Sequence, residues 1–152
     1  MASFKFARWS VALALAAAAS SAAAGPVEQV KGRVTGFKTL GEAFKSVNDG
    51  LRGGQVQAQI VQKAAAQISS AARDQYRWFP AGSGPQSGLK TAAKPEIWTR
   101  PAAFRAAQDA FARQAGAFQR IASSGDAAAI KSEARKLGAT CKSCHDAFRV
   151  SN

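Results

Sequence analysis

Four stretches of the chain carry apolar residues at alternating steps of three and four, which is the spacing of one face of a helix. The first contains Val27, Val30, Val34, Phe37, Gly41, Phe44, Val47 and Leu51, and the second, richer in alanine, contains Val56, Ile60, Ala64, Ile68 and Ala71. The third contains Phe104, Ala107, Phe111, Ala115, Phe118 and Ile121, and the fourth contains Ile130, Ala134, Leu137, Cys141, Cys144 and Phe148. Four narrow apolar faces of comparable length predict an all-α fold, an antiparallel four-helix bundle.

Residues that start and stop helices support these limits. Pro26 suits the first turn of a helix, Gly50 and Gly53-Gly54 suit a stop, and Asp126 suits an N-cap. The stretch 77–100 holds three of the five prolines, so it is predicted to be a long loop between the second and third helices.

The fourth stretch contains the motif Cys141-Lys142-Ser143-Cys144-His145, which has the spacing of a c-type haem attachment sequence. On a helix the two cysteines lie on one face, and the histidine lies beside them. Cys141 and Cys144 can then reach the two vinyl groups of one porphyrin, and His145 can bind the iron. Because both cysteines fall in register with core positions, the haem is expected to lie partly inside the bundle.

Other uses of two cysteines fit the sequence less well. A redox dithiol of the thioredoxin kind expects a βαβ pattern, and the chain has no strand-like alternation. A structural zinc ion takes four ligands, whereas the chain has 2 cysteines and 1 histidine. A plain disulfide leaves the position of the histidine unexplained. A haem-free dithiol or metal-binding bundle therefore stays as the alternative hypothesis.

The first 24 residues have the pattern of a cleaved signal peptide. Lys5 and Arg8 precede a short apolar run, 11–19, and small residues follow, with cleavage most plausible after Ala24 or Ala22. The apolar run is shorter than the ~20 residues that span a bilayer. We therefore expect an exported protein with one domain, residues 25–152.

The formal net charge of +12 raises the question of a polyanionic partner. The basic residues are scattered along helix faces and the chain is predicted to be exported, so nucleic acid is not expected. An acidic redox partner or an anionic membrane surface fits better, and the simplest alternative is a solvated, self-repelling surface. No paired carboxylates, nucleophile–base arrangement or phosphate loop is evident, so no enzyme activity is expected.

The haem segment 137–149 and its place at the C-terminus resemble the class II c-type cytochromes, most closely the cytochrome c′ family. The segments 94–98, 124–126 and 33–38 also match that family. The resemblance implies one covalent haem c, a periplasmic location, and binding of small gases or transfer of electrons. Members often form homodimers through their first two helices.

The same resemblance bears on the second axial position of the iron. In the methionine-ligated members a methionine follows the arginine of the first helix by four positions, but here Arg33 is followed by Phe37. Met1 is the only methionine and would leave with the signal, and an amine such as Lys38 would have to be deprotonated near the iron. We expect five-coordinate, high-spin iron that binds NO or CO, with Phe37 over the open face, although a phenylalanine at this spacing can equally be a core residue.

The resemblance gives two arginines a role beside the haem. Arg33 would pair with a haem propionate, and its alternative is a solvated helix residue. Arg149 would lie close to the proximal side, and its alternative is a cation near a helix C-terminus. Gly138, one turn before Cys141, is either room for the porphyrin or a tolerated glycine. The loop 77–100 either covers the haem edge or caps the bundle through Trp78, Phe79 and Trp98.

Overall fold

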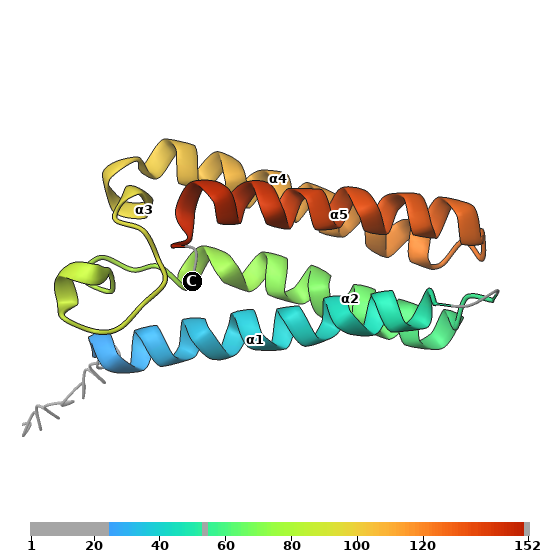
Figure 1. Cartoon of the computed structure of the whole chain (residues 1–152), viewed down its shortest axis with the longest axis horizontal. Coiled ribbons are helices and arrows are strands. Elements are labelled where there is room, and N and C mark those ends of the chain that lie inside the picture. The colour runs from blue at the N-terminus through green and yellow to red at the C-terminus, as the bar shows by residue number, and fades with distance from the viewer. Residues whose placement is uncertain (1–24, 53–54, 151–152) are drawn as a thin grey trace, which may run out of the picture.

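The computed structural model describes residues 25–52 and 55–150. Four long helices run antiparallel along one axis, with short helical turns in the connection between the second and the third (Figure 1). The elements in chain order are α1 (Pro26–Gly50), α2 (Ala58–Asp74), η1 (Gln75–Arg77), η2 (Pro85–Ser87), α3 (Glu96–Thr99), α4 (Pro101–Ala122) and α5 (Ala127–Phe148). The predicted all-α four-helix bundle is confirmed, while the predicted signal peptide, 1–24, and Gly53-Gly54 lie outside the described residues.

The helices pack in a ring that is not fully closed. α1 packs on α2, α2 on α4, and α4 on α5, whereas α1 and α5 make few contacts with each other. Between α1 and α5, Leu40, Phe44 and Cys141 pack instead against the core that all four long helices share.

The main core receives residues from all four long helices. Its largest fully buried side chains are Phe118, Ile68, Ile130, Leu137, Val47 and Val61. Burying one such side chain stabilises a fold by roughly 1.5–3 kcal/mol. The predicted apolar faces of the third and fourth helices are confirmed, since every core residue named for them is buried or half-buried.

The predicted face of the first helix is partly wrong. Val27 and Val34 are 46% and 58% exposed, whereas Arg33, which was not predicted to face inward, is 3% exposed. Ile60, predicted to face the core from the second helix, is 44% exposed. Arg33 faces inward because α1 packs against the connection after α2, and polar groups of that connection bind its guanidinium.

Local chemistry accounts for the helix ends. α1 begins at Pro26, as predicted, and a Cβ on Gly50 would lie 2.9 Å from Cγ2 of Val61, so the α1–α2 turn requires a glycine there. The α4–α5 turn contains Gly125 with φ of 76°, a left-handed conformation that favours glycine. The predicted N-cap of α5 is confirmed, because Oδ1 of Asp126 accepts the main-chain N–H groups of Ala128 and Ala129.

The connection 75–100 has more structure than the predicted loop. It contains η1, η2 and α3, and it returns to the end of α5 through an isolated antiparallel bridge between Ala93 and Arg149. The main chain of this connection therefore lies against the turn that follows the haem motif (Figure 1). No helix in the described ranges has the length and apolar character needed to cross a membrane.

Candidate functional site

The motif residues lie in the last turns of α5, where that helix meets both apolar clusters of the protein. Cys141 packs against the main core, together with Leu40 and Phe44 of α1. Cys144 packs against a second cluster that is built from Ala93, Ile97, Phe104 and Phe148. Both thiols are free and half-buried. A group attached to both sulfur atoms would thus lie on the boundary between the two clusters.

The thiols do not have the electrostatic environment of a redox dithiol. Burial raises the pKa of Cys141, the nearby Cys144 raises it further, and burial also raises the pKa of Cys144. Catalytic dithiols require the opposite, a thiolate stabilised near neutral pH. The protonated thiols therefore count against the dithiol alternative.

The metal-binding alternative also lacks support. Within the described ranges no three side chains among histidine, cysteine, aspartate and glutamate come together in a group that could hold a metal ion. A closed zinc site needs four such ligands.

His145 lies on the exposed side of the last turn of α5. Partial desolvation lowers the pKa of its imidazole, Arg149 lowers it further, and Asp146 opposes this. A lowered pKa favours the neutral imidazole, which is the form that binds a metal ion.

Arg149 is the C-cap residue of α5. Its side chain is exposed, and its main-chain N–H donates to the carbonyl of His145 at 2.9 Å. It lies beside the predicted iron ligand and also at a helix C-terminus, so both interpretations made from the sequence fit this position.

Phe37 borders the same group of aromatic rings as Cys144. Its ring meets that of Trp78 edge to face, with centroids 4.8 Å apart, and lies 5.9 Å from the ring of Phe79. Phe79 in turn contacts Phe104, which contacts Phe148 of α5. The distal residue predicted on α1 and the second cysteine of α5 are therefore connected by a continuous aromatic cluster.

Arg33 is buried and bound by the connection after α2, so its interpretation as a solvated helix residue is wrong. Its guanidinium donates to the carbonyl of Trp78 (3.4 Å), to Oγ and the carbonyl of Ser83 (3.1 and 3.0 Å), and to Oγ1 of Thr91 (3.0 Å). The ring of Phe79 lies 4.8 Å from its Cζ. Burial lowers the pKa of the guanidinium.

No carboxylate of the described chain forms an ion pair with Arg33. A buried charge usually has a partner of opposite sign. The positive charge of Arg33 could therefore be balanced by an anionic group such as a haem propionate. This role of Arg33 remains a prediction.

Three residues that bind parts of this site, Ser83, Thr91 and Lys94, were not among those predicted from the sequence. Ser83 and Thr91 bind Arg33, and Lys94 donates from Nζ to the carbonyl of Asp146 at 2.8 Å. These partners are far from one another in the sequence and share no periodic pattern, so the sequence carried no signal for them.

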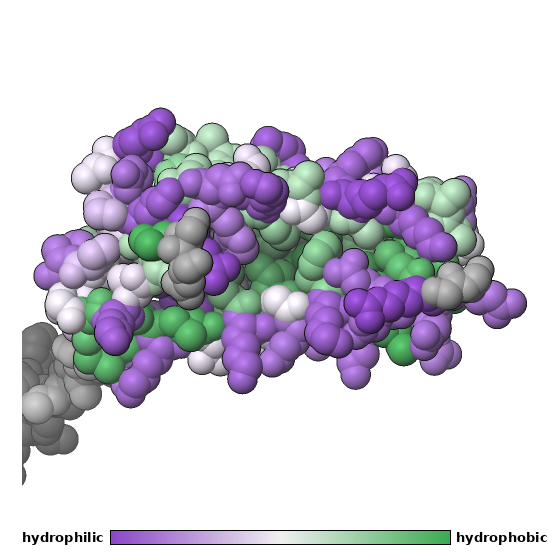
Figure 2. All heavy atoms as spheres, viewed as in Figure 1, coloured by the Kyte–Doolittle hydropathy of each residue, from purple (hydrophilic) through white to green (hydrophobic). Residues whose placement is uncertain are grey.

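A cleft lies between α1 and α5, on the N-terminal side of the motif along α5. It has a volume of about 260 Å³ and is lined by Phe44, Asn48, Leu51, Lys131, Ala134, Arg135 and Gly138. Figure 2 shows apolar surface at the bottom of a hollow between these two helices. A Cβ on Gly138 would lie 3.2 Å from Cζ of Phe44, so the glycine lets the ring of α1 lie close to α5. The two half-buried thiols beside the apolar clusters, and a buried guanidinium without a carboxylate partner, fit an amphiphilic group with acidic substituents.

The chain is similar to known proteins over most of its length. The family model described as Cytochrome C′ matches residues 28–149. The cytochrome c′ of Allochromatium vinosum is 30% identical over 143 residues, which cover 92% of each chain. That of Rhodopseudomonas palustris is 36% identical over 118 residues, 75% of this chain and 76% of the relative.

Solved structures agree with the sequence relatives. The crystal structure of cytochrome c′ from Thermochromatium tepidum superposes with a TM-score of 0.76 at 26% identity, over 84% of this chain and 98% of that one. Another cytochrome c′, described as having a ligand-controlled dimer dissociation, gives a TM-score of 0.78 at 27% identity, over 86% of this chain and 100% of that one. The fold, the match over most of the chain and the two cysteines for covalent haem c together show that the chain belongs to the cytochrome c′ family.

Proposed function

We propose that this protein is a periplasmic, monohaem c-type cytochrome with five-coordinate, high-spin iron that binds NO or CO. Bound haem would supply an iron atom that alternates between the ferric and ferrous states and binds the gas. The observation that carries the proposal is the position of Phe37, a side chain without a lone pair, among aromatic rings that border the second cysteine.

Each side chain of the site has a defined task in this proposal. Cys141 and Cys144 hold the porphyrin by thioether bonds, and His145 is the single protein ligand of the iron. Arg33 provides a buried positive charge for a propionate, and Arg149 lies beside the proximal histidine. Gly138 lets the ring of Phe44 approach α5 one turn before the first cysteine.

The apolar character of the distal side selects among gases. The side chains of Phe37 and Phe79 carry no hydrogen-bond donor, and Trp78 carries only its indole N–H. Bound O₂ is stabilised by a donor, whereas NO and CO depend on it less. One relative supports the same choice, since the nitric oxide complex of a variant cytochrome c′ from Alcaligenes xylosoxidans has this fold, with a TM-score of 0.76 at 25% identity.

Absorption and electron paramagnetic resonance spectra of the purified protein test the coordination state. We expect a high-spin ferric spectrum, and Phe37→Met should move it toward six-coordinate, low-spin iron. Phe37→Ala should speed CO binding, while the matched change Val34→Ala, at an exposed position of the same helix, should not. A low-spin spectrum of the native protein would contradict the proposal. So would a CO association rate that is the same in the native protein and in Phe37→Ala.

Covalent attachment has a separate test. The Soret absorption should remain with the protein after acid–acetone extraction. A colourless protein with two titratable thiols would instead support the haem-free alternative. In either case the described residues suggest no catalytic machinery, and the protein is proposed to act without turnover of a substrate.

Electron transfer is the second candidate role. The formal net charge of +12, or +10 once Lys5 and Arg8 leave with the predicted signal peptide, favours an acidic redox partner over a basic one. Absence of a sixth ligand favours gas binding, because a change of coordination on redox cycling slows electron exchange. The rate of reduction by small donors, compared with the rate of NO binding, distinguishes the two roles.

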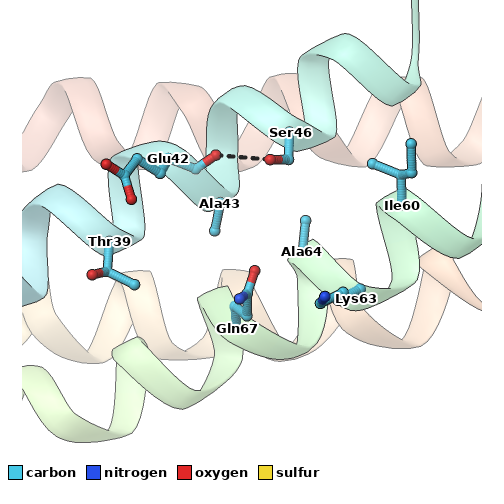
Figure 3. A pocket seen from close by; sticks show the side chains of 8 residues that line it. All are labelled: Thr39, Glu42, Ala43, Ser46, Ile60, Lys63, Ala64 and Gln67. Atoms are coloured by element: carbon cyan, nitrogen blue, oxygen red, sulfur yellow. Dashed lines mark hydrogen bonds between the residues drawn. The ribbon is translucent and has the colours of Figure 1, made fainter.

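A homodimer through α1 and α2 is part of the proposal. A groove between these helices has Ala43 and Ala64 facing each other across it, with Glu42 and Lys63 among its other lining residues (Figure 3). Ile60 lines the same groove and is 44% exposed. A solved relative is described as a dimer that dissociates under ligand control. Ile60→Glu should lower the sedimentation coefficient to that of a monomer, while Val150→Glu, at an equally exposed site, should not.

The proposed periplasmic location depends on the predicted signal peptide, residues 1–24. Protein isolated from the periplasmic fraction should begin near Gly25, as read by N-terminal sequencing. An uncleaved N-terminus would contradict the assignment of residues 1–24 as a signal peptide.

A further inference from the structure

Trp78 lies directly against the main chain of α1 at Gly36. A Cβ on Gly36 would lie between 2.5 and 2.8 Å from three atoms of the indole ring, Cζ2, Cη2 and Cε2 of Trp78. Real Cβ atoms do not come that close to an aromatic ring, so the ring and a side chain at position 36 cannot both occupy this place. Gly36 is therefore the residue that admits the indole.

The next residue of α1 contacts the same ring. Phe37 meets Trp78 edge to face with centroids 4.8 Å apart and an interplanar angle of 76°. Aromatic pairs of this geometry are stabilised beyond their buried area. Two consecutive residues of α1 thus define the place of Trp78, and Trp78 in return restricts the ring of Phe37.

The main chain of Trp78 is held from two sides. Its N–H donates to the carbonyl of Gln75 at 3.1 Å, and its carbonyl accepts from Arg33 at 3.4 Å. Gln75 is itself buried and exchanges two hydrogen bonds with Gln108, side-chain amide to main-chain carbonyl in both directions. Because these hydrogen bonds hold the main chain of Trp78 in place, its indole can support the ring of Phe37.

We propose that Trp78 is a positioning residue for Phe37, and that the contact between Gly36 and the indole sets how closely the Phe37 ring covers the open face of the iron. This inference depends on the proposed function, because it assigns Phe37 to the distal face. Trp78 acts through Phe37 and does not itself touch the iron or the gas.

Gly36→Ala is the most direct test. The added methyl group displaces the indole, the Phe37 ring loses its support, and the CO association rate of the ferrous protein should rise by about two- to tenfold, the range that one aromatic pair is worth. Gly41→Ala is the matched control, since a Cβ at Gly41 meets no atom within 4 Å. It makes the same chemical change in the same helix and should leave the rate unaltered. Equal rates for the two variants would overturn the inference.

A double-mutant cycle separates action through Phe37 from a direct effect. Trp78→Ala should raise the CO rate by a similar factor in the native background, and it should change the rate no further once Phe37→Ala is present. Additive effects would show that Trp78 acts independently, and this would overturn the inference. Trp78→Phe keeps a ring at the contact and should give an intermediate rate.

A structural readout makes the outcomes distinguishable. In the diamagnetic ferrous CO form, nuclear Overhauser contacts between the Trp78 indole and the Phe37 ring should be present in the native protein and lost in Gly36→Ala. If these contacts behave so while Phe37→Ala leaves the CO rate unchanged, the positioning of Phe37 stands and its distal role fails. If the contacts are absent in the native protein, the inference itself fails.

Discussion

The main-chain N–H of Lys94 donates to the carbonyl of Phe148 at 3.0 Å, which joins the connection after α2 to the last residue of the haem-bearing helix. The N–H of Val150 returns a hydrogen bond to the carbonyl of Ala92 at 2.8 Å. Because Thr91 of the same connection accepts from Arg33 of α1, one segment of chain contacts both helices that flank the proposed haem.

A single substitution can remove one of the two main-chain hydrogen bonds between this connection and the end of α5. Val150→Pro removes the N–H that binds Ala92, and the preceding residue, Arg149, is already extended, as a residue before proline prefers. We expect a loss of about 1 kcal/mol in the free energy of unfolding. Amide hydrogen exchange at Lys94 should become faster, because its own bond is then the only main-chain link left in the bridge.

Val150→Ala is the control for this prediction. It shortens an exposed side chain but keeps the N–H, so neither the stability nor the exchange rate at Lys94 should change measurably. The same exchange rate in the proline and alanine variants would show that the bridge does not hold the connection to α5.

Replacement of the buried arginine should have a large cost. Arg33→Met leaves polar groups of Ser83 and Thr91 without their donor in a buried place. We expect the free energy of unfolding in urea to fall by about 2–4 kcal/mol. Lys31→Met, two positions away and exposed in a pair with Glu28, should change it by less than about 0.5 kcal/mol. Similar values for the two variants would show that the buried hydrogen bonds contribute little.

Either cysteine alone should hold the haem. Cys141 borders the main core and Cys144 borders the aromatic cluster. Each single change to serine should leave one thioether and a haem that is still retained. Mass spectrometry of the intact protein should show the added mass of haem in both single variants and in the control Ser143→Ala. The double change should give the mass of the bare polypeptide, and haem retained in it after extraction would contradict attachment through these residues.

The sequence predicted those features that depend on local spacing. The faces of α4 and α5 follow a simple apolar period, the motif at Cys141 depends on one helical turn, and the N-cap at Asp126 depends on two neighbouring amides. The face of α1 was predicted less well, because Arg33 faces inward only where Ser83 and Thr91 can bind it. Such pairings join distant parts of the chain, and apolar periodicity does not register them.

Contacts of Phe37 illustrate the same limit. Its place in an apolar stripe was evident from the sequence, but the ring that supports it comes from Trp78, in a stretch predicted to be a loop. The need for glycine at position 36 likewise depends on the indole of Trp78, which the sequence pattern does not place beside it.

Acid should destabilise the protein partly through Glu133, which joins α5 to α4. Its carboxylate accepts from Nζ of Lys136 at 3.0 Å and from Nε2 of Gln114 at 2.6 Å. The bond from Lys136 is the main reason that its pKa lies below the ordinary 4.5, with desolvation acting in the opposite direction and Gln114 lowering the pKa further. Since the folded protein binds this proton more weakly than the unfolded chain, the contribution is present above about pH 4.5 and is lost as the pH falls through the lower, folded pKa.

Glu133→Gln removes the titrating group, so the decline in the free energy of unfolding between about pH 5 and about pH 3 should be shallower than in the native protein. Lys136→Met keeps the carboxylate but removes the main cause of its lowered pKa, and it should make the decline shallower in the same direction. Urea unfolding at a series of pH values measures both slopes. Because Lys136 is exposed and its pair with Glu133 is local, the effect on stability at neutral pH should be small. An acid dependence that neither substitution changes would mean that Glu133 has the same proton affinity in the folded and unfolded states.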